Sequence, residues 1–140
     1  MGNILATRMV ARGAVGIVTD GCFRDSPAIA SMEIASYARS AHAATNKTVH
    51  HPADIQLPVG CGGVAVYPGD IMVGDAEGVI VVPRDMADEV ALEAALQEHR
   101  EDFILAKIAG GSPLLGTYPA DDQTLAEYEQ YCKTSPPPGS

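Results

Sequence analysis

The sequence predicts an α/β fold in which helices cover a mixed sheet and a long helix follows near the C-terminus. Three observations support this prediction. A segment with helical apolar spacing precedes the first apolar run, several short apolar runs are separated by turn-sized gaps, and a long helical pattern comes after them. The order of helix, strand, helical turn, several strands and helices is typical of an α/β or α+β layer arrangement.

The first two elements are a helix and a buried strand. Residues 3–11 carry apolar side chains at helical spacing, and Gly13 is suited to end this helix. Residues 14–18 are a short apolar run of the kind found in buried strands. We therefore expect the strand to lie directly after the helix.

A turn signal and a helical turn come next. The pair Asp20-Gly21 is typical of a turn, so we expect the strand to end and the chain to reverse just before Arg24. The pair Ser26-Pro27 favours the start of a short helix, with Asp25 or Ser26 as its cap.

The middle of the chain is predicted to consist of strands joined by turns. A second strand is expected at residues 34–39, and residues 48–59 also look extended. The glycine-rich segment 60–63 should form a tight turn, since it lacks the Gly-Lys-Ser/Thr sequence of a phosphate-binding loop. Three further strands with turn-sized gaps should pair antiparallel, and they cover residues 64–67, 71–74 and 79–82.

Two helices are expected after these strands. The longer one covers about residues 85–109 and ends at Gly110-Gly111, and a shorter one begins at Thr124. Because 140 residues fit one domain, we expect a single domain over residues 1–133 and a flexible tail over residues 134–140.

Composition and charge exclude several classes of partner. Hydrophobic residues make up 46% of the chain, which is enough for a packed core. The net charge is −9 and the pI is near 4.6, so a nucleic-acid surface and an anionic membrane are not expected. A small anionic substrate remains compatible with this charge, because one arginine can dominate a local pocket.

The cysteines and the first residues indicate a cytoplasmic protein. Cys22, Cys61 and Cys132 are odd in number and widely spaced, so a disulfide framework is not expected. The sequence shows no secretion signal and no apolar run of membrane-spanning length.

The pair Arg24-Asp25 is the first candidate site. It follows a predicted strand and a glycine turn, where functional groups often lie in open α/β sheets. Arginine can bind a carboxylate through two parallel hydrogen bonds, and aspartate can hold a hard cation such as Mg²⁺ or Mn²⁺. Together they could bind a 2-oxo acid. Taken alone, the pair could also be a solvated turn with a capping aspartate, and the local sequence favours that simpler interpretation.

The segment Gly2-Asn3-Ile4-Leu5 is the second candidate. The first N–H groups of a helix have no partner within the helix and can receive an anion. Gly2 would let a ligand approach the backbone closely. An ordinary helix start would have the same sequence, so this segment is not decisive alone.

The two segments belong to an ordered set of motifs that resembles a known family. This family groups the regulator of ribonuclease activity A (RraA) with the metal-dependent 4-hydroxy-4-methyl-2-oxoglutarate aldolases. The resemblance runs from Gly2 to about the middle of the long helix. The motifs that carry it are Gly2–Thr7, Ala11–Gly13, Gly16–Val18, Asp20–Asp25, Pro58-Val59, Gly62–Val64, Pro68–Asp70, Gly74-Asp75 and Gly78–Pro83, while Arg24–Ile29 and Thr48–His51 look like the ribonuclease-regulator branch.

The resemblance implies a fold, an assembly and a site. The implied fold is a compact α/β/β sandwich related to swivelling phosphohistidine domains, assembled as a homotrimer or homohexamer with sites near the subunit interfaces. It implies that the backbone amides of Gly2–Leu5 bind the pyruvoyl part of the substrate, that Arg24 binds the substrate and stabilises the enolate, and that Asp25 holds the divalent metal. Aldol cleavage would release pyruvate, and oxaloacetate decarboxylation would proceed through the same enolate.

The sequence also departs from the family pattern. Asn3 and Ala28 stand where many members carry acids, which would orient metal-bound waters. Members also carry a substantial segment before the glycine that matches Gly2, so we expect a truncated or late-started chain. Three hypotheses follow: a metal-dependent lyase acting on small 2-oxo acids, a non-catalytic regulator that binds a ribonuclease, and an inactive fragment of the fold.

Other chemistry-bearing residues have simpler interpretations. His50 and His51 are adjacent and would point to opposite faces of a strand, so we expect surface or packing roles for them. Cys22 is interpreted as a small buried residue, although it lies near Arg24 in the sequence. Residues that fit turn chemistry or a solvated helix face are Asp70, Asp75, Glu98, Glu101 and Asp102.

Overall fold

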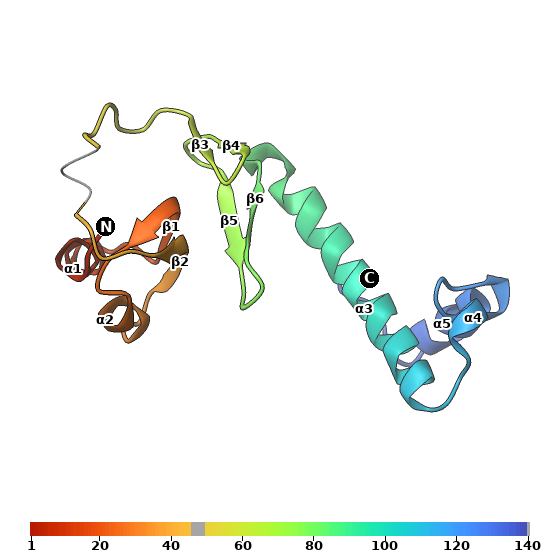
Figure 1. The fold of residues 1–140 in the computed structure, drawn as a ribbon. Coiled ribbons are helices and arrows are strands. Elements are labelled where there is room, and N and C mark those ends of the chain that lie inside the picture. The colour runs from red at the N-terminus through yellow and green to blue at the C-terminus, as the bar shows by residue number, and fades with distance from the viewer. Residues whose placement is uncertain (46–49, 140) are drawn as a thin grey trace. The chain divides into compact units, whose positions relative to one another are not determined.

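The computed structural model describes residues 1–45 and 50–139. They form two compact units, Met1–Pro83 and Arg84–Ser140, which are described separately here (Figure 1). Part of the extended segment expected at residues 48–59, and part of the Thr48–His51 motif, lie outside the described residues. The single domain expected over residues 1–133 stays a prediction.

The first helix has the predicted bounds. Helix α1 covers Asn3–Ala11, with Gly2 as its extended N-cap residue. Its only buried side chain is that of Ala6, which belongs to the core of the unit. A methyl group at this position lets the helix backbone approach the strands beneath it.

The first strand is longer than predicted. Strand β1 covers Gly16–Phe23 and pairs in parallel with β2, which covers Ala35–Ala41. The expected chain reversal at Asp20-Gly21 is therefore wrong. The register shifts between Thr19 and Cys22, and the Gly21 N–H donates to Thr19 Oγ1 over 3.0 Å. The turn-forming pair thus makes an irregularity within the strand, and pairing with β2 resumes beyond it.

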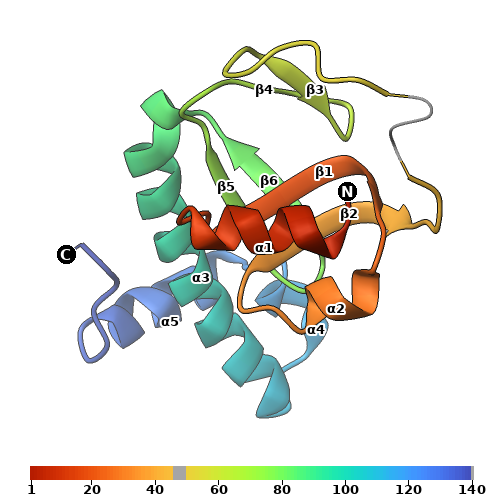
Figure 2. The same ribbon diagram turned by 90° about the vertical axis from the view of Figure 1, so that its left-hand side faces the viewer.

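The helical turn after β1 confirms the next prediction. Helix α2 covers Ser26–Ala30, with Asp25 as its N-cap residue, although the Asp25 side chain makes no cap hydrogen bond there. Figure 2 shows α1 lying across the β1–β2 pair. The core that these elements share contains Ala6, Ile17, Phe23 and Ile29, with Met1, Met32, Ile34 and Ala38 packed against it.

The remaining strands form two hairpins. Strands β3, Val59–Cys61, and β4, Val64–Val66, pair antiparallel around the Gly62-Gly63 turn, where both residues have positive φ. The type of turn predicted for residues 60–63 is therefore confirmed. Strands β5, Ile71–Gly74, and β6, Val79–Val82, pair in the same way.

The strands of the described residues do not join into the one mixed sheet that the sequence suggested. They form three sheets of two strands each. Each of the four later strands is only three or four residues long and pairs with its hairpin neighbour alone. Contact between the sheets comes from side chains: a Cβ added at Gly74 would lie 2.7 Å from the Tyr37 ring, so β5 approaches β2 closely there. The α/β fold class itself is confirmed.

Asp70, between β4 and β5, and Asp75, between β5 and β6, act as predicted. Asp70 Oδ2 accepts the N–H of Tyr67 at 2.8 Å. Asp75 Oδ1 accepts the N–H groups of Glu77 at 2.8 Å and Gly78 at 3.2 Å. These local bonds explain both residues without a role in binding.

The second unit is helical. A 3₁₀ turn, η2, covers Arg84–Met86, and α3 covers Ala87–Ala109 before the predicted stop at Gly110-Gly111. A helical turn, α4, covers Leu114–Thr117. The side chains of Glu98, Glu101 and Asp102 are exposed, as expected. Within the described residues, no helix is both long enough and apolar enough to cross a membrane.

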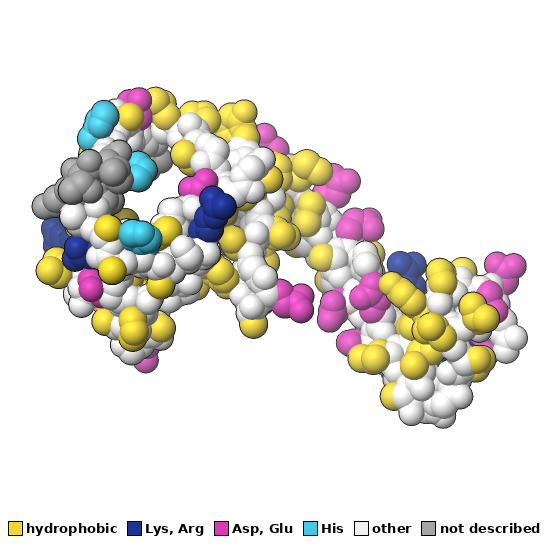
Figure 3. All heavy atoms as spheres, in the orientation of Figure 1, with side chains coloured by type: hydrophobic (Ala, Val, Ile, Leu, Met, Phe, Trp, Pro, Cys, Tyr) yellow, Lys and Arg dark blue, Asp and Glu magenta, His cyan; other side chains and the backbone are white. Residues whose placement is uncertain are grey.

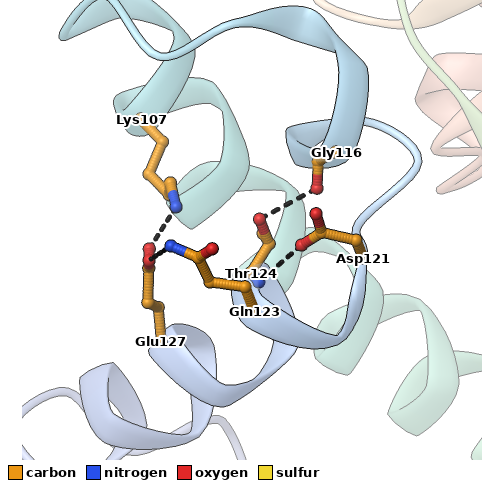
Figure 4. A network of polar contacts seen from close by, with 6 residues as sticks. All are labelled: Lys107, Gly116, Asp121, Gln123, Thr124 and Glu127. Carbon is orange, nitrogen blue, oxygen red and sulfur yellow. Dashed lines mark hydrogen bonds and ion pairs between the residues drawn. The ribbon is translucent and has the colours of Figure 1, made fainter.

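The last helix starts two residues before the predicted Thr124. Helix α5 covers Asp122–Cys132 because Asp121 caps it (Figure 4): Asp121 Oδ1 accepts the N–H of Thr124 at 2.8 Å. The buried Thr124 hydroxyl donates to the Gly116 carbonyl at 2.9 Å, which ties the start of α5 to α4.

An ion pair joins α3 to α5. Lys107 donates to the Glu127 carboxylate, and Gln123 Nε2 donates to the same carboxylate at 3.1 Å (Figure 4). The hydrogen bond from Lys107 lowers the pKa of Glu127. The backbone hydrogen bond from Thr124 lowers the pKa of Asp121. The ionised form of both carboxylates is therefore the one that the folded unit favours.

Replacing Ile29 should destabilise the Met1–Pro83 unit. Its side chain is only 2% exposed, so Ile29→Ala should leave a cavity that lowers the free energy of unfolding by about 2–5 kcal/mol. Urea unfolding followed by circular dichroism measures this change. Ile55→Ala is the matched control, because Ile55 is 86% exposed and its loss should have little effect. Equal changes in the two variants would contradict the assigned core.

Acidification should lower the stability of the Arg84–Ser140 unit. Because folding lowers the pKa of both carboxyl groups, their ionisation stabilises the folded unit when the pH is above their pKa values in the unfolded chain. This stabilisation is lost as the pH falls below about 4. A double variant, Asp121→Asn with Glu127→Gln, should show a smaller drop in melting temperature between pH 7 and pH 3. Glu129→Gln, an exposed carboxylate of the same helix, is the control. An unchanged drop in the double variant would refute the assignment.

Candidate functional site

The carboxyl end of β1 is hydrogen-bonded on both edges. On one edge, Met1 N donates to the Cys22 carbonyl at 2.8 Å and Arg24 N donates to the Met1 carbonyl at 2.6 Å. This is the bonding pattern of a parallel neighbour. On the other edge, His42 N donates to the Phe23 carbonyl at 2.8 Å and extends the pairing with β2.

Three backbone segments therefore continue side by side from the carboxyl ends of these parallel neighbours. Gly2 follows Met1, Arg24 follows the end of β1, and His42 follows the end of β2. Ligands of open α/β sheets commonly bind at the carboxyl ends of parallel strands. The topology thus brings together three segments that are far apart along the chain.

The start of α1 meets the Asp25 carboxylate. The Asn3 N–H donates to Asp25 Oδ2 at 3.3 Å. A Cβ added at Gly2 would lie 2.7 Å from that same oxygen and 3.6 Å from Arg24 Nε. Gly2 is extended, with φ −119°, so its lack of a side chain matters because of this close approach and not because of its backbone angle.

Asp25 holds a backbone conformation that few residues adopt. Its φ is 54° and its ψ is 33°, in the left-handed region. Aspartate is one of the residues that tolerate this region, and the carbonyl of Asp25 accepts the N–H groups of Ala28 and Ile29 at 2.9 and 3.1 Å. The turn directs the Asp25 side chain toward the start of α1. Such strained residues are often found at binding sites.

Arg24 is placed to contact a ligand. Its Nη2 atom lies 3.9 Å from Asp25 Oδ2, and both side chains are 41% exposed. An ion pair of this length and exposure is weak. The guanidinium therefore keeps donors that an incoming carboxylate can use.

These groups line one pocket of about 620 Å³ in the Met1–Pro83 unit. The pocket contains every residue that the sequence singled out as a site residue, and their binding roles stay predictions. It is lined by Met1, Gly2, Asn3, Ile4, Leu5, Gly21, Cys22, Arg24, Asp25, His42, Ala44, Thr45 and His50. A pocket of this size suits a small organic ligand.

Two imidazoles in the lining were missed as site residues by the sequence interpretation. His50 was expected to have a surface or packing role, and His42 was not singled out at all. Both side chains are exposed, and Figure 3 shows histidine side chains around a hollow in this unit. The position of His42 directly after a strand was the one signal that could have indicated it. Cys22 is half-buried, and its Sγ lies 3.1 Å from Ser40 Oγ.

The side chains of the pocket bear on which cation it would suit. Asp25 is the one carboxylate in the described lining of this pocket. Across residues 1–45 and 50–139, no three His, Cys, Asp or Glu side chains are grouped to hold a metal ion. Zinc requires three or four such ligands, whereas Mg²⁺ is often held by one or two carboxylates together with waters and the substrate.

A larger hollow lies elsewhere in the same unit. Its volume is about 1150 Å³, and it is lined mainly by apolar side chains of the strands, such as Val64, Met72 and Val81. Among the described residues, its lining includes none of the predicted site residues. The smaller pocket is therefore the candidate site, since donors, a cationic side chain and a carboxylate converge there.

Comparison with known proteins decides the family. The model of the RraA-like family, described as Aldolase/RraA, matches residues 1–81. The chain belongs to the RraA-like family. The matched segment contains the whole pocket, and the resemblance drawn from the sequence motifs is confirmed.

Relatives and solved structures agree with this membership. A protein of Halalkalibacterium halodurans, provisionally named a 4-hydroxy-4-methyl-2-oxoglutarate aldolase, is 36% identical over 90 residues, which cover 64% of this chain and 42% of the relative. An uncharacterised protein of Pseudomonas syringae pv. tomato superposes with a TM-score of 0.76 at 32% identity, covering 84% of this chain and 58% of that one.

A further solved structure belongs to the regulator side of the family. Streptomyces coelicolor RraAS2, described as an unusual member of the RNase ES inhibitor RraA protein family, superposes with a TM-score of 0.63 at 28% identity. The match covers 76% of this chain and 54% of that one. The RraA-like chain spans about half the length of the curated aldolase relatives that it matches.

Adding a methyl group at Gly2 should displace Asp25. In Gly2→Ala, the new Cβ would clash with Asp25 Oδ2, so the hydrogen bond to Asn3 should break at a cost of about 1 kcal/mol. Faster amide hydrogen exchange at Asn3, measured by NMR, would show the loss. Gly60→Ala is the control, since a Cβ there meets no atom within 4 Å. Unchanged exchange at Asn3 in Gly2→Ala would contradict the close approach.

Proposed function

We propose that this RraA-like chain carries the substrate-binding elements of a metal-dependent lyase for small 2-oxo acids. The reaction would be aldol cleavage of 4-hydroxy-4-methyl-2-oxoglutarate or decarboxylation of oxaloacetate. The observation that carries the proposal is the convergence of the first turn of α1, Arg24 and Asp25 on one pocket. The provisional aldolase names of its relatives support the same class of reaction.

Binding would use the α1 amides and Arg24. The first N–H groups of α1 carry the positive end of the helix dipole, which favours a carboxylate. The Arg24 guanidinium would bind the carboxylate and the 2-oxo oxygen through parallel hydrogen bonds. Gly2 supports this geometry, because any side chain there would occupy the space beside Arg24 and Asp25.

The chemistry requires charge stabilisation at the 2-oxo oxygen. In both reactions, the bond to the carbon next to the oxo group breaks, and its electron pair forms the enolate of pyruvate. In aldol cleavage, the hydroxyl group on the departing carbon loses its proton to solvent and becomes the oxo group of the second product, a 2-oxo acid. In decarboxylation, the second product is carbon dioxide. Protonation of the enolate carbon then yields pyruvate. Arg24 would lower the barrier because it donates more strongly to the developing oxyanion than to the starting carbonyl.

Asp25 is the residue that would hold a divalent cation, either Mg²⁺ or Mn²⁺. Once bound, the cation would supply further positive charge for the enolate oxygen. Asn3 and Ala28 stand where many family members carry acids, so Asp25 would hold it with fewer protein ligands. The proposal includes assembly as a homotrimer or homohexamer, which could cover exposed apolar side chains near the pocket, such as those of Ile4 and Leu5.

A ribonuclease regulator is the second candidate. The similarity to RraAS2 favours it, and the neutral Asn3 and Ala28 are compatible with a member that no longer catalyses the reaction. A regulator would bind a ribonuclease scaffold on a column, and that binding would not depend on Arg24. The two candidates are thus distinguishable in one protein preparation.

Replacing Arg24 should reduce pyruvate release. With oxaloacetate and Mg²⁺, Arg24→Ala should lower kcat/KM by roughly 10- to 100-fold, the effect of losing a charge-assisted hydrogen bond. Pyruvate release is followed with a coupled assay, and removal of Mg²⁺ by a chelator should lower the rate of the unmodified protein as well. Arg8→Ala is the control, because Arg8 is exposed on α1 and does not line the pocket.

Two results would refute the lyase proposal. One is the absence of pyruvate release above the uncatalysed rate in the unmodified protein. The other is an Arg24→Ala variant that retains the full rate. Retention on a ribonuclease scaffold together with either result would favour the regulator.

A further inference from the structure

His42 follows the carboxyl end of β2, next to the carboxyl end of β1 that Arg24 follows. Its backbone N–H is fixed by the 2.8 Å hydrogen bond to the Phe23 carbonyl. Its side chain is exposed and lines the same pocket as Arg24 and the first turn of α1. Neither the family motifs nor the proposed chemistry gives this imidazole a role.

A local hydrogen bond fixes which nitrogen of His42 carries the proton. The backbone N–H of Ala44 donates to His42 Nδ1 at 3.0 Å. A nitrogen that accepts a hydrogen bond carries no proton, so the proton of the neutral ring lies on Nε2. The neutral ring therefore presents Nε2–H as a hydrogen-bond donor, while Nδ1 is used within the loop.

A substrate with two carboxylates would need a second hydrogen-bond donor in this pocket. Arg24 is the one cationic side chain in the described lining, and in the proposed function it binds the carboxylate next to the oxo group. A dicarboxylate brings a second anionic group, which needs a hydrogen-bond donor other than Arg24 once it is desolvated. At about 620 Å³, the pocket has room for more than the three carbons of pyruvate.

We infer that His42 Nε2–H binds the distal carboxylate of a 2-oxo dicarboxylate and so makes the pocket prefer dicarboxylates to monocarboxylates. This inference rests on the proposed function, since it assumes that Arg24 and the α1 amides hold the 2-oxo acid end. His42 acts here as a specificity-determining residue. It takes no part in breaking the carbon–carbon bond.

Two substitutions separate this role from a purely structural one. Asparagine places a carbonyl oxygen near the position of Nδ1, so His42→Asn should keep an acceptor for Ala44 but lose the distal donor. Glutamine places its amide group near the position of Nε2, so His42→Gln should keep the distal donor and lose the local acceptor. The two variants thus form a crossed pair at one position.

The experiment measures the binding of two probes by calorimetry in the presence of Mg²⁺. The probes are 2-oxoglutarate, a dicarboxylate, and pyruvate, a monocarboxylate. His42→Asn should weaken 2-oxoglutarate binding by roughly tenfold and change pyruvate binding less than about twofold, the effect of one lost hydrogen bond to a charged group. His42→Gln should bind 2-oxoglutarate within about threefold of the unmodified protein. Circular dichroism checks that both variants fold.

Other outcomes overturn the inference in distinguishable ways. If His42→Asn binds both probes normally while His42→Gln weakens both, His42 serves the loop and not the ligand. If both variants bind both probes normally but Arg24→Ala loses pyruvate, the inference fails and the proposed function stands. If Arg24→Ala also binds pyruvate normally, or if the unmodified protein binds neither probe, the proposed function fails together with the inference.

Discussion

The hydrogen bonds at the carboxyl end of β1 determine where every candidate site residue lies. Cys22 and Arg24 bond to Met1 on one edge of the strand, and Phe23 bonds to His42 on the other. Because successive backbone groups of a strand point to opposite edges, three consecutive residues can hold two neighbouring segments at once. The buried side chain of Phe23 anchors this end of the strand in the core. The site is thus attached to the hydrophobic core of its unit.

The pocket at the carboxyl end of β1 combines hydrogen-bond donors from the backbone and from side chains. Helix α1 contributes backbone N–H groups, Arg24 contributes a guanidinium, and His42 contributes an imidazole whose Nδ1 is used by the Ala44 N–H. Asp25 is the single described carboxylate among them, and it is already hydrogen-bonded to Asn3. The net charge of −9 is therefore compatible with the proposed anion site, because local donors act more strongly on a ligand than distant acidic residues do.

Local sequence predicted most of the elements but not their pairing. Apolar spacing was sufficient for α1 and α3, whereas Asp20-Gly21 was interpreted as a turn because its parallel pairing with a later strand is a tertiary effect that local sequence does not show. The start of α5 was missed because the cap at Asp121 lies before the first apolar residue. At the site, Gly2–Leu5 and Arg24-Asp25 were each compatible with ordinary structure, and the family resemblance singled them out. His42 was missed because its importance depends on strand order.

If the first turn of α1, Arg24 and the loop after β2 form one anion site, that site should bind oxalate, a planar dianion that resembles the enolate of pyruvate. Titration with oxalate in the presence of Mg²⁺, followed by ¹⁵N NMR, should give saturable shifts at the amides of Asn3, Ile4, Leu5 and Ala44 and at the Arg24 side chain, with Gly110 unaffected. The absence of shifts at α1 and Arg24, or shifts confined to other parts of the chain, would show that these segments do not form one anion site.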